Sequence, residues 1–290
     1  MIDGTQRRNL LGLGGAGLVA AVAGSVLDAR QAAAQAVPAS LLRTVLDRGH
    51  LIVGTGSTNP PWHFEDDKGQ LTGMDIAMAR ILAKGLFDDV TKVEFVRQEA
   101  NARIPNITTG KVDVTIQFMT ISPARAQIVA FSRPYYVEGA ALMTGTKSKY
   151  QTYKDLQAAG KAVRVSVLQN VDADILAHQA LPDATVMQLD SQANVMQAVV
   201  AGRADVAVVD ASTVKWLAKR NTGDYTDPGF AYGSQLYGAA VRQGDPDWIR
   251  WIDTCFNVAM HGNQPQIYTA AFQEFFGDTP PVQKPGFPPF

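Results

Sequence analysis

The residues of this chain best suited to chemistry gather at the end of one apolar segment. An alternating strand is predicted over residues 112–116, and it leads to Thr120 and then to Ser122 and Pro123. Serine followed by proline is typical of a helix N-cap and a first helical residue. Arg125 would then lie near a helix start, where backbone N–H groups point outward. A guanidinium fork, a hydroxyl and free N–H groups together suit a carboxylate.

A simpler interpretation is that Arg125 pairs with a surface acid and Thr120 only packs. Surface arginines are common, so an isolated Ser-Pro-x-Arg turn does not identify a site. The rest of the chain has to decide between the two.

The N-terminus has the pattern of an export signal. Arg7 and Arg8 precede an apolar run rich in glycine and alanine that extends to Gly24, and small residues follow around 34–36. This predicts a twin-arginine-type signal peptide over residues 1–36, cleaved near Ala36, and a mature protein in the periplasm. A membrane anchor fits less well, because a span needs about 20 strongly apolar residues.

Composition agrees with an exported two-domain protein. Without the signal, the 290 residues leave roughly 250, enough for two lobes with cores of their own. A net charge of −1 does not suggest nucleic acid or an anionic membrane as a partner. The single cysteine, Cys255, rules out an internal disulfide and is expected to pack as a small apolar group. A nucleophilic role would need a histidine and an acid nearby.

Short apolar strands alternate with helical patterns, which predicts parallel α/β units. The pattern runs twice along the chain. The first block is predicted as strand 51–54, helix 73–86, strand 93–96 and helix 102–109, which Gly110 would end. The second is predicted as helix 153–159, strand 162–168, helix 172–179, strand 185–189, helix 192–201 and strand 205–209.

The two blocks resemble each other where a helix passes into a strand. Residues 109–114 and 201–206 share a glycine, a basic residue, an aspartate and an apolar strand, and the second strand leads to Asp210. Ligands of open α/β sheets bind beyond the carboxyl ends of strands. If the blocks face each other, Thr120 and Arg125 meet Asp210, a pattern that an α-amino acid zwitterion requires. The alternative is that Asp210 only caps the helix expected over 211–220.

At this point the chain resembles the family 3 extracellular solute-binding proteins, which capture amino acids for ABC importers. The resemblance covers nearly all of the mature chain. The segments that carry it are 47–54, Asn59-Pro60-Pro61-Trp62-His63-Phe64, 69–76, 102–105, 110–113, 120–125, 131–136, 202–205 with Asp210, and 237–241.

The resemblance implies a type II, two-lobed Venus-flytrap α/β fold with two hinge crossovers. Lobe 1 would hold residues 40–139 plus 241–290, and lobe 2 residues 140–240. The crossings would fall near 139–144 and 236–241, and closure about them would bury an amino-acid ligand. The resemblance further implies a monomer that is not an enzyme, needs no cofactor or metal, and partners the membrane permease of an ABC transporter.

The family's ligand-binding residues carry over at three positions. Arg125 is similar to the carboxylate-binding arginine, Thr120 to its hydroxyl partner, and Asp210 to the ammonium-binding acid. Many relatives carry Gly followed by Ser or Thr where this chain has Asn170 and Val171, so only backbone donors are expected to remain there.

Other positions that would contact a ligand side chain also depart from the family pattern. Gln117 and Phe118 stand where many amino-acid binders have small residues, and Asn59 takes a place that is often aromatic. Trp62 is expected to wall the pocket instead. Gln117 and Asn59 favour a ligand with a polar group, although simple loop and cap hydrogen bonds explain them equally well. Arg103 is interpreted mainly as a structural element.

Two other function classes stay open. Some proteins of this fold resemble cyclohexadienyl dehydratases, and His63 or Glu65 could then act as a general acid. Against this, the Arg125 and Asp210 pair suits a zwitterion, with no clear second carboxylate or histidine in the matched positions. A sensor ectodomain would need a membrane span and a signalling domain after the segments described above.

Overall fold

The structure is a computed structural model that describes residues 39–170, 172–220, 223–280 and 286. The predicted export signal over residues 1–36 lies outside these ranges. Among the described helices, none combines the length and the apolar character needed to cross a membrane.

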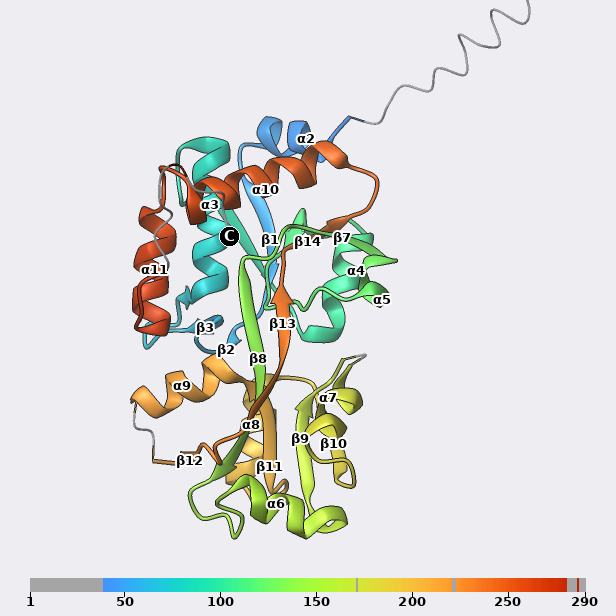
Figure 1. The fold of residues 1–290 in the computed structure, drawn as a ribbon. Helices are drawn as coiled ribbons and strands as arrows, with labels where there is room; N and C mark the ends of the chain where they lie inside the picture. The colour runs from blue at the N-terminus through green and yellow to red at the C-terminus, as the bar shows by residue number, and fades with distance from the viewer. Residues whose placement is uncertain (1–38, 171, 221–222, 281–285, 287–290) are drawn as a thin grey trace, which may run out of the picture. The chain divides into compact units, whose positions relative to one another are not determined.

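The first of two main sheets has five strands in the order β5-β1-β6-β14-β7 (Figure 1). β1 is parallel to β5 and β6, whereas β14 is antiparallel to β6 and β7. The strands are β1 Leu51–Thr55, β5 Val93–Arg97, β6 Val114–Thr115, β7 Val129–Phe131 and β14 Ala240–Arg242. The helices of this half, called lobe 1 below, are α2 Leu41–Arg48, α3 Met74–Phe87, α4 Arg103–Thr108, α5 Pro123–Ala126, α10 Pro246–His261 and α11 Gln266–Phe276, with the 3₁₀ turn η1 Ala100–Ala102. A small sheet of β2 Thr58–Asn59, β3 His63–Glu65 and β4 Leu71–Thr72 adjoins them.

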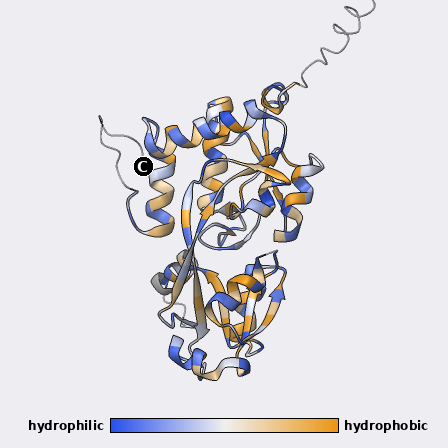
Figure 2. Cartoon of the chain, turned by 45° about the vertical axis from the view of Figure 1, so that its right-hand side comes forward, coloured by the Kyte–Doolittle hydropathy of each residue, from blue (hydrophilic) through white to orange (hydrophobic). Residues whose placement is uncertain are grey.

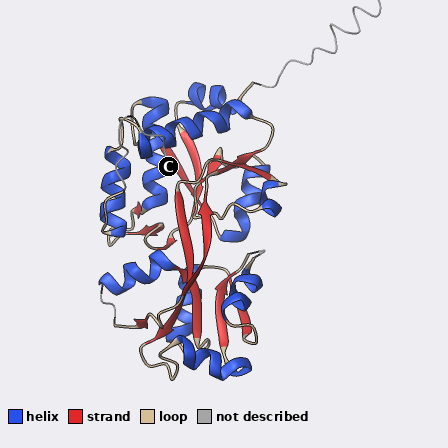
Figure 3. Ribbon diagram, in the orientation of Figure 1, coloured by secondary structure: helices blue, strands red, loops and turns tan. Residues whose placement is uncertain are grey.

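The second main sheet has the order β10-β9-β11-β8-β12, and β13 also pairs with β8. Its strands are β8 Tyr136–Gly145, β9 Arg164–Leu168, β10 Thr185–Leu189, β11 Val206–Asp210, β12 Tyr225–Thr226 and β13 Ala231–Tyr237. The helices of this half, lobe 2, are α6 Tyr153–Ala159, α7 Ala173–Ala180, α8 Gln192–Val200 and α9 Ala211–Arg220, with the 3₁₀ turn η2 Gly160–Ala162. Figure 3 shows helices lying against the strands in both halves.

Two long strands connect the sheets. β8 and β13 pair with each other in antiparallel register, and β13 leads directly into β14 of the first sheet. Residues 140–144 of β8 pair with β11 inside the second sheet. The prediction that the first crossing falls at 139–144 is therefore wrong: the chain leaves the first sheet after Phe131 and is already in the second at Ala140.

The predicted α/β order is confirmed, with element ends that differ by a residue or two. The alternating strand over residues 112–116 is wrong in its length, because β6 spans only Val114–Thr115. Asp113 and Thr115 are buried together with their apolar neighbours. β6 lies between β1 and β14, and a central strand covered on both faces does not show a polar and an apolar side.

Capping residues explain where several helices begin. Asp245 accepts a hydrogen bond from the backbone of Trp248, and Pro246 is the first residue of α10. Trp248 and Phe256 of this helix are buried in the lobe 1 core with Leu82 of α3. Hydrophobic residues concentrate along the strands and on the helix faces toward them (Figure 2). The same hydrophobic cluster also includes lobe 2 residues such as Val195 and Ala207, so buried packing extends from one sheet to the other near the strand ends.

Candidate functional site

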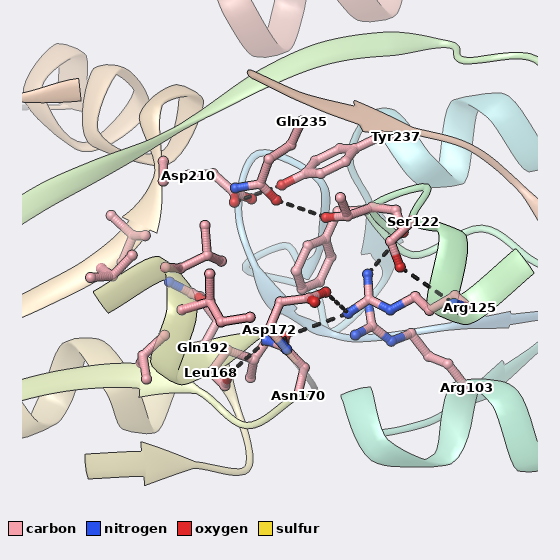
Figure 4. Close-up of a pocket in the computed structure, with 18 residues that line it drawn as sticks. Arg103, Ser122, Arg125, Leu168, Asn170, Asp172, Gln192, Asp210, Gln235 and Tyr237 are labelled. Atoms are coloured by element: carbon pink, nitrogen blue, oxygen red, sulfur yellow. Dashed lines mark hydrogen bonds and ion pairs between the residues drawn. The ribbon is translucent and has the colours of Figure 1, made fainter. Parts of the chain in front are cut away.

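A cavity of about 220 Å³ lies at the strand ends where the two halves of the fold meet (Figure 4). Lobe 1 and β13 line it with Arg103, Phe118, Thr120, Ser122, Arg125, Gln235 and Tyr237, and lobe 2 lines it with Ala140, Val167, Leu168, Asn170, Asp172, Ile175, Leu176, Gln192, Val208, Val209 and Asp210. The cavity is smaller than the range of about 300–1,000 Å³ typical of drug-sized ligands. Its size suits a small metabolite.

Arg125 is held at one side of the cavity by the turn that precedes it. Ser122 is the N-cap of α5 and accepts a hydrogen bond from the Arg125 backbone at 3.4 Å, as predicted. Nη1 of Arg125 donates to the Thr120 carbonyl at 2.8 Å. Nη2 lies 3.3 Å from Oδ2 of Asp172 and 3.5 Å from Oδ1 of Asn170. Burial lowers the pKa of Arg125, and Asp172 opposes this shift.

Arg103 places a second guanidinium beside the first. Its Nε donates to the Ala100 carbonyl at 2.8 Å and its Nη1 to the Gln117 carbonyl at 3.1 Å. Burial, with the nearby charge of Arg125, lowers the pKa of Arg103 to about 10. These backbone contacts are structural, as the sequence suggested, yet the side chain also lines the cavity.

Asp210 lies at the opposite side, at the end of β11. Its Oδ1 accepts a 2.7 Å hydrogen bond from the Tyr237 hydroxyl. Its Oδ2 is buried and has no hydrogen-bond partner among the described residues. Burial, followed by the charge of Glu138, raises the pKa of Asp210 well above its ordinary value, while the nearby side chains of Tyr237 and Asn59 oppose this shift. A buried carboxyl oxygen without a partner is uncommon, because most buried polar atoms make a hydrogen bond.

Glu138 accepts hydrogen bonds from the start of α9, the helix that Asp210 could have capped. Oε1 of Glu138 accepts from the Ser212 backbone at 3.3 Å, and its Oε2 accepts from the Ser212 hydroxyl at 2.5 Å. A residue of β8 therefore caps one backbone N–H in the first turn of α9, and Asp210 is among the residues that line the cavity.

Thr120 and Asn170 line the cavity but already have protein partners. The Thr120 hydroxyl donates to Oε1 of Gln235 at 2.7 Å. Oδ1 of Asn170 accepts from the Asp172 backbone at 2.9 Å, and its Nδ2 donates to the Leu168 carbonyl at 2.8 Å. Val171, also predicted for the site, lies outside the described residues.

Of the remaining predicted site residues, one lines the cavity and three are buried behind its wall. Phe118 lines the cavity. Asn59, Trp62 and Gln117 are buried and are not among the described residues that line it. Trp62 donates from Nε1 to the Ser212 hydroxyl at 2.9 Å, and Gln117 accepts from Gln98 at 3.0 Å. These three side chains support the elements behind the cavity.

Sequence reasoning did not place five polar residues of the cavity in the site: Ser122, which it identified only as a helix N-cap, and Asp172, Gln192, Gln235 and Tyr237. Two signals were available. Asp172 follows Asn170 and Val171, two positions where the chain departs from the family pattern, and Tyr237 opens the last matched segment. Gln192 and Gln235 had no comparable signal, because glutamines are common on protein surfaces.

The two residues considered as general acids lie away from the cavity lining. His63 is only 2% exposed, places Nδ1 2.8 Å from Oδ2 of Asp75, and stacks on Phe118. Glu65 accepts from Nε of Arg97 at 2.9 Å on the surface. Phe118 therefore separates His63 from the cavity.

The cavity has basic and acidic residues in different parts of its wall. Arg125 and Arg103 line one side, and Asp210 lines the other with Oδ2 unpaired among the described residues (Figure 4). Together with two α/β lobes joined by crossing strands, this arrangement defines a type II two-lobed periplasmic binding protein. The sequence profile of the bacterial extracellular solute-binding proteins, family 3, matches residues 51–276, and the chain belongs to this family.

Relatives in this family have names that describe amino-acid binding. The chain is 29% identical over 215 residues to the L-cystine-binding protein of Escherichia coli, a match that covers 73% of this chain and 78% of the relative. It is 26% identical over 207 residues to the glutamine-binding ABC transporter protein of Bacillus subtilis, covering 71% of this chain and 74% of the relative.

A solved structure of the same fold supports this placement. The crystal structure of an ancestral amino-acid-binding protein, described as a precursor of cyclohexadienyl dehydratase, matches with a TM-score of 0.71 and 32% sequence identity. The match covers 82% of this chain and all of that one. The predicted family and the two-lobed fold are thereby confirmed.

Proposed function

We propose that this protein binds an L-amino acid with a polar side chain in the cavity between its lobes. The observation that carries the proposal is the placement of Arg125 and Asp210 on opposite sides of one cavity. A carboxylate would pair with the Arg125 guanidinium, and an ammonium would bind the unused Oδ2 of Asp210.

Other polar residues in the cavity wall support the proposal that the ligand has a polar side chain. Arg103, Gln192 and Gln235 line the cavity in addition to the zwitterion-binding residues. Val167, Leu176 and Val208 line the lobe 2 side and suit the methylene groups of the ligand.

We further propose that the protein works in the periplasm as a monomer and delivers its ligand to the permease of an ABC transporter. The names of the relatives support this role, and the residue pattern over 1–36 supports twin-arginine export. Residues 40–139 plus 241–290 and residues 140–240 would move as the two lobes.

A thermal-shift screen of the mature protein against the twenty amino acids tests the binding proposal. We expect one or a few polar amino acids to raise the melting temperature, and Arg125→Ala and Asp210→Ala to abolish that rise. Arg164→Ala is the matched control, because Arg164 is a half-exposed arginine that pairs with Asp205. If no amino acid stabilises the protein, the zwitterion model fails.

An enzyme related to cyclohexadienyl dehydratase is a second candidate, and one observation favours it. The raised pKa of Asp210 is a property that general acids share, and this side chain lines the cavity. Incubation with prephenate or arogenate, followed by product detection, separates the two functions. Turnover that Asp210→Asn abolishes would replace the binding proposal with the enzymatic one.

A further inference from the structure

Asp172 contacts the Arg125 guanidinium, the group that a ligand carboxylate would bind. Its Oδ2 lies 3.3 Å from Nη2 of Arg125, and the two side chains come from different lobes. Figure 4 shows Asp172 directed across the cavity toward the guanidinium. Arg125 is 6% exposed, so this ion pair is largely shielded on the arginine side.

The local backbone would allow Asp172 a different role. It occupies the N-cap position of α7, where an aspartate normally accepts a hydrogen bond from the first turn. Within the described part of the chain, its side chain makes no such capping bond. Asp172 therefore gives up a common helix-capping contact and pairs with Arg125 instead.

The free donors of Arg125 are limited. Nη1 donates to the Thr120 carbonyl, and Nη2 serves Asp172 and Asn170. A carboxylate that accepts two hydrogen bonds uses either Nη1 and Nη2 or Nε and Nη2, so in both cases it needs Nη2, which Asp172 already contacts. It would also meet the like charge of Asp172 at short range.

We propose that Asp172 is an internal competitor for Arg125, which a ligand carboxylate has to displace. The side chain of Asp172 is 32% exposed, so it can turn toward solvent when displaced. Asp172 thereby weakens binding of amino acids and sets a threshold for which ligands bind. This inference rests on the proposed function, because it assumes a ligand with a carboxylate.

Isothermal titration calorimetry of the mature protein with the ligand found in the thermal-shift screen tests this role. Asp172→Asn keeps the shape of the side chain and removes its charge. We expect this variant to bind the amino acid at least about tenfold more tightly than the natural protein. Asp174→Asn is the matched control, because Asp174 lies in the first turn of the same helix but is exposed and does not line the cavity.

The amide of the same amino acid sharpens the test, because it lacks the negative charge. The affinity of the protein for this amide should differ by less than twofold between Asp172→Asn and the natural protein. Unchanged or weaker binding of the free amino acid overturns the proposal. Weaker binding of both the acid and the amide would show instead that Asp172 holds a cationic group of the ligand.

Small-angle X-ray scattering without ligand supplies a readout that does not depend on amino-acid binding. Loss of an ion pair between the lobes should give Asp172→Asn a larger radius of gyration than Asp174→Asn. Equal radii would overturn the pairing. If no amino acid binds any variant, the proposed function fails, while the scattering comparison still decides whether Asp172 pairs across the cavity.

Discussion

The Tyr237 hydroxyl donates a 2.7 Å hydrogen bond to Oδ1 of Asp210, while Oδ2 of the same carboxyl group is buried without a partner among the described residues. Tyr237 belongs to β13, a crossing strand, and Asp210 ends β11. The crossing strand therefore orients the acid through one of its two carboxyl oxygens.

Asp210→Asn should stabilise the fold at high pH and abolish ligand binding. Burial raises the pKa of Asp210 above its ordinary value of 3.8. At pH values between 3.8 and the raised pKa of the folded state, the folded protein holds a proton that the unfolded chain has released. Folding stability therefore falls as pH rises through this interval. Asparagine does not carry this penalty. We expect a gain on the order of 1 kcal/mol, a few degrees in Tm, at pH 8 and little difference near pH 4.

Thermal unfolding at both pH values, with Asp174→Asn as an exposed control, checks this prediction. A lower Tm of Asp210→Asn at pH 8 would contradict it.

Arg125→Lys should fail to restore binding although it keeps the positive charge. An ammonium cannot reproduce the planar fork that would hold a carboxylate and also donate to the Thr120 carbonyl. We expect affinity for the amino acid to fall at least about 100-fold, or roughly 3 kcal/mol. Calorimetry measures this loss, with Arg164→Lys as the surface control. Binding within tenfold of the natural protein would show that charge alone suffices.

Gly73→Ala should destabilise lobe 1 strongly. Gly73 is the N-cap of α3 with φ of 120°, and an added Cβ would lie 2.3 Å from the Trp62 carbonyl oxygen. Backbone atoms cannot move aside cheaply, so we expect a loss of about 3 kcal/mol or more.

Gly110→Ala is the matched control for backbone strain. Gly110 has φ of 74° and no atom within 4 Å of an added Cβ. Its substitution should cost only about 1 kcal/mol. Urea unfolding of both variants compares them, and equal losses would mean that the clash at Gly73 relaxes.

Cys255 should react slowly with thiol reagents until the protein unfolds. Burial raises the pKa of the Cys255 thiol to about 12, so thiolate is scarce at pH 8. Its Sγ lies 2.9 Å from where a Cβ on Gly85 would be, which places it against α3. Labelling with a chromogenic disulfide, with and without denaturant, checks this. Rapid labelling of the native protein would contradict the predicted burial effect.

Much of the architecture could be read from residue patterns because those patterns are local. The helix over 153–159 and the strand over 185–189 have the predicted limits, and Ser122 with Pro123 starts α5 as expected. Gly110 follows α4 with a positive φ, as its position suggested. In each case a few neighbouring residues decide the backbone conformation.

The cavity wall was harder to predict because it joins segments that are distant in the chain. Trp62 was expected in the wall, but its hydrogen bond to Ser212 and its contacts with Tyr136 and Tyr237 hold it behind the wall. Asp172 was overlooked, because only the approach of α7 to α5 brings it within reach of Arg125.

The α/β order and the family could be predicted from residue patterns, since they depend on local spacing and on motif order. The same patterns pointed to Thr120, Arg125 and Asp210, which line one cavity. Which oxygens and nitrogens of these side chains have partners depends on the folded structure. Packing assigns the Thr120 hydroxyl to Gln235 and an edge of Arg125 to Asp172, and it leaves Oδ2 of Asp210 unused. Hydrogen-bonding capacity depends on which groups meet in space, and chain order does not specify that.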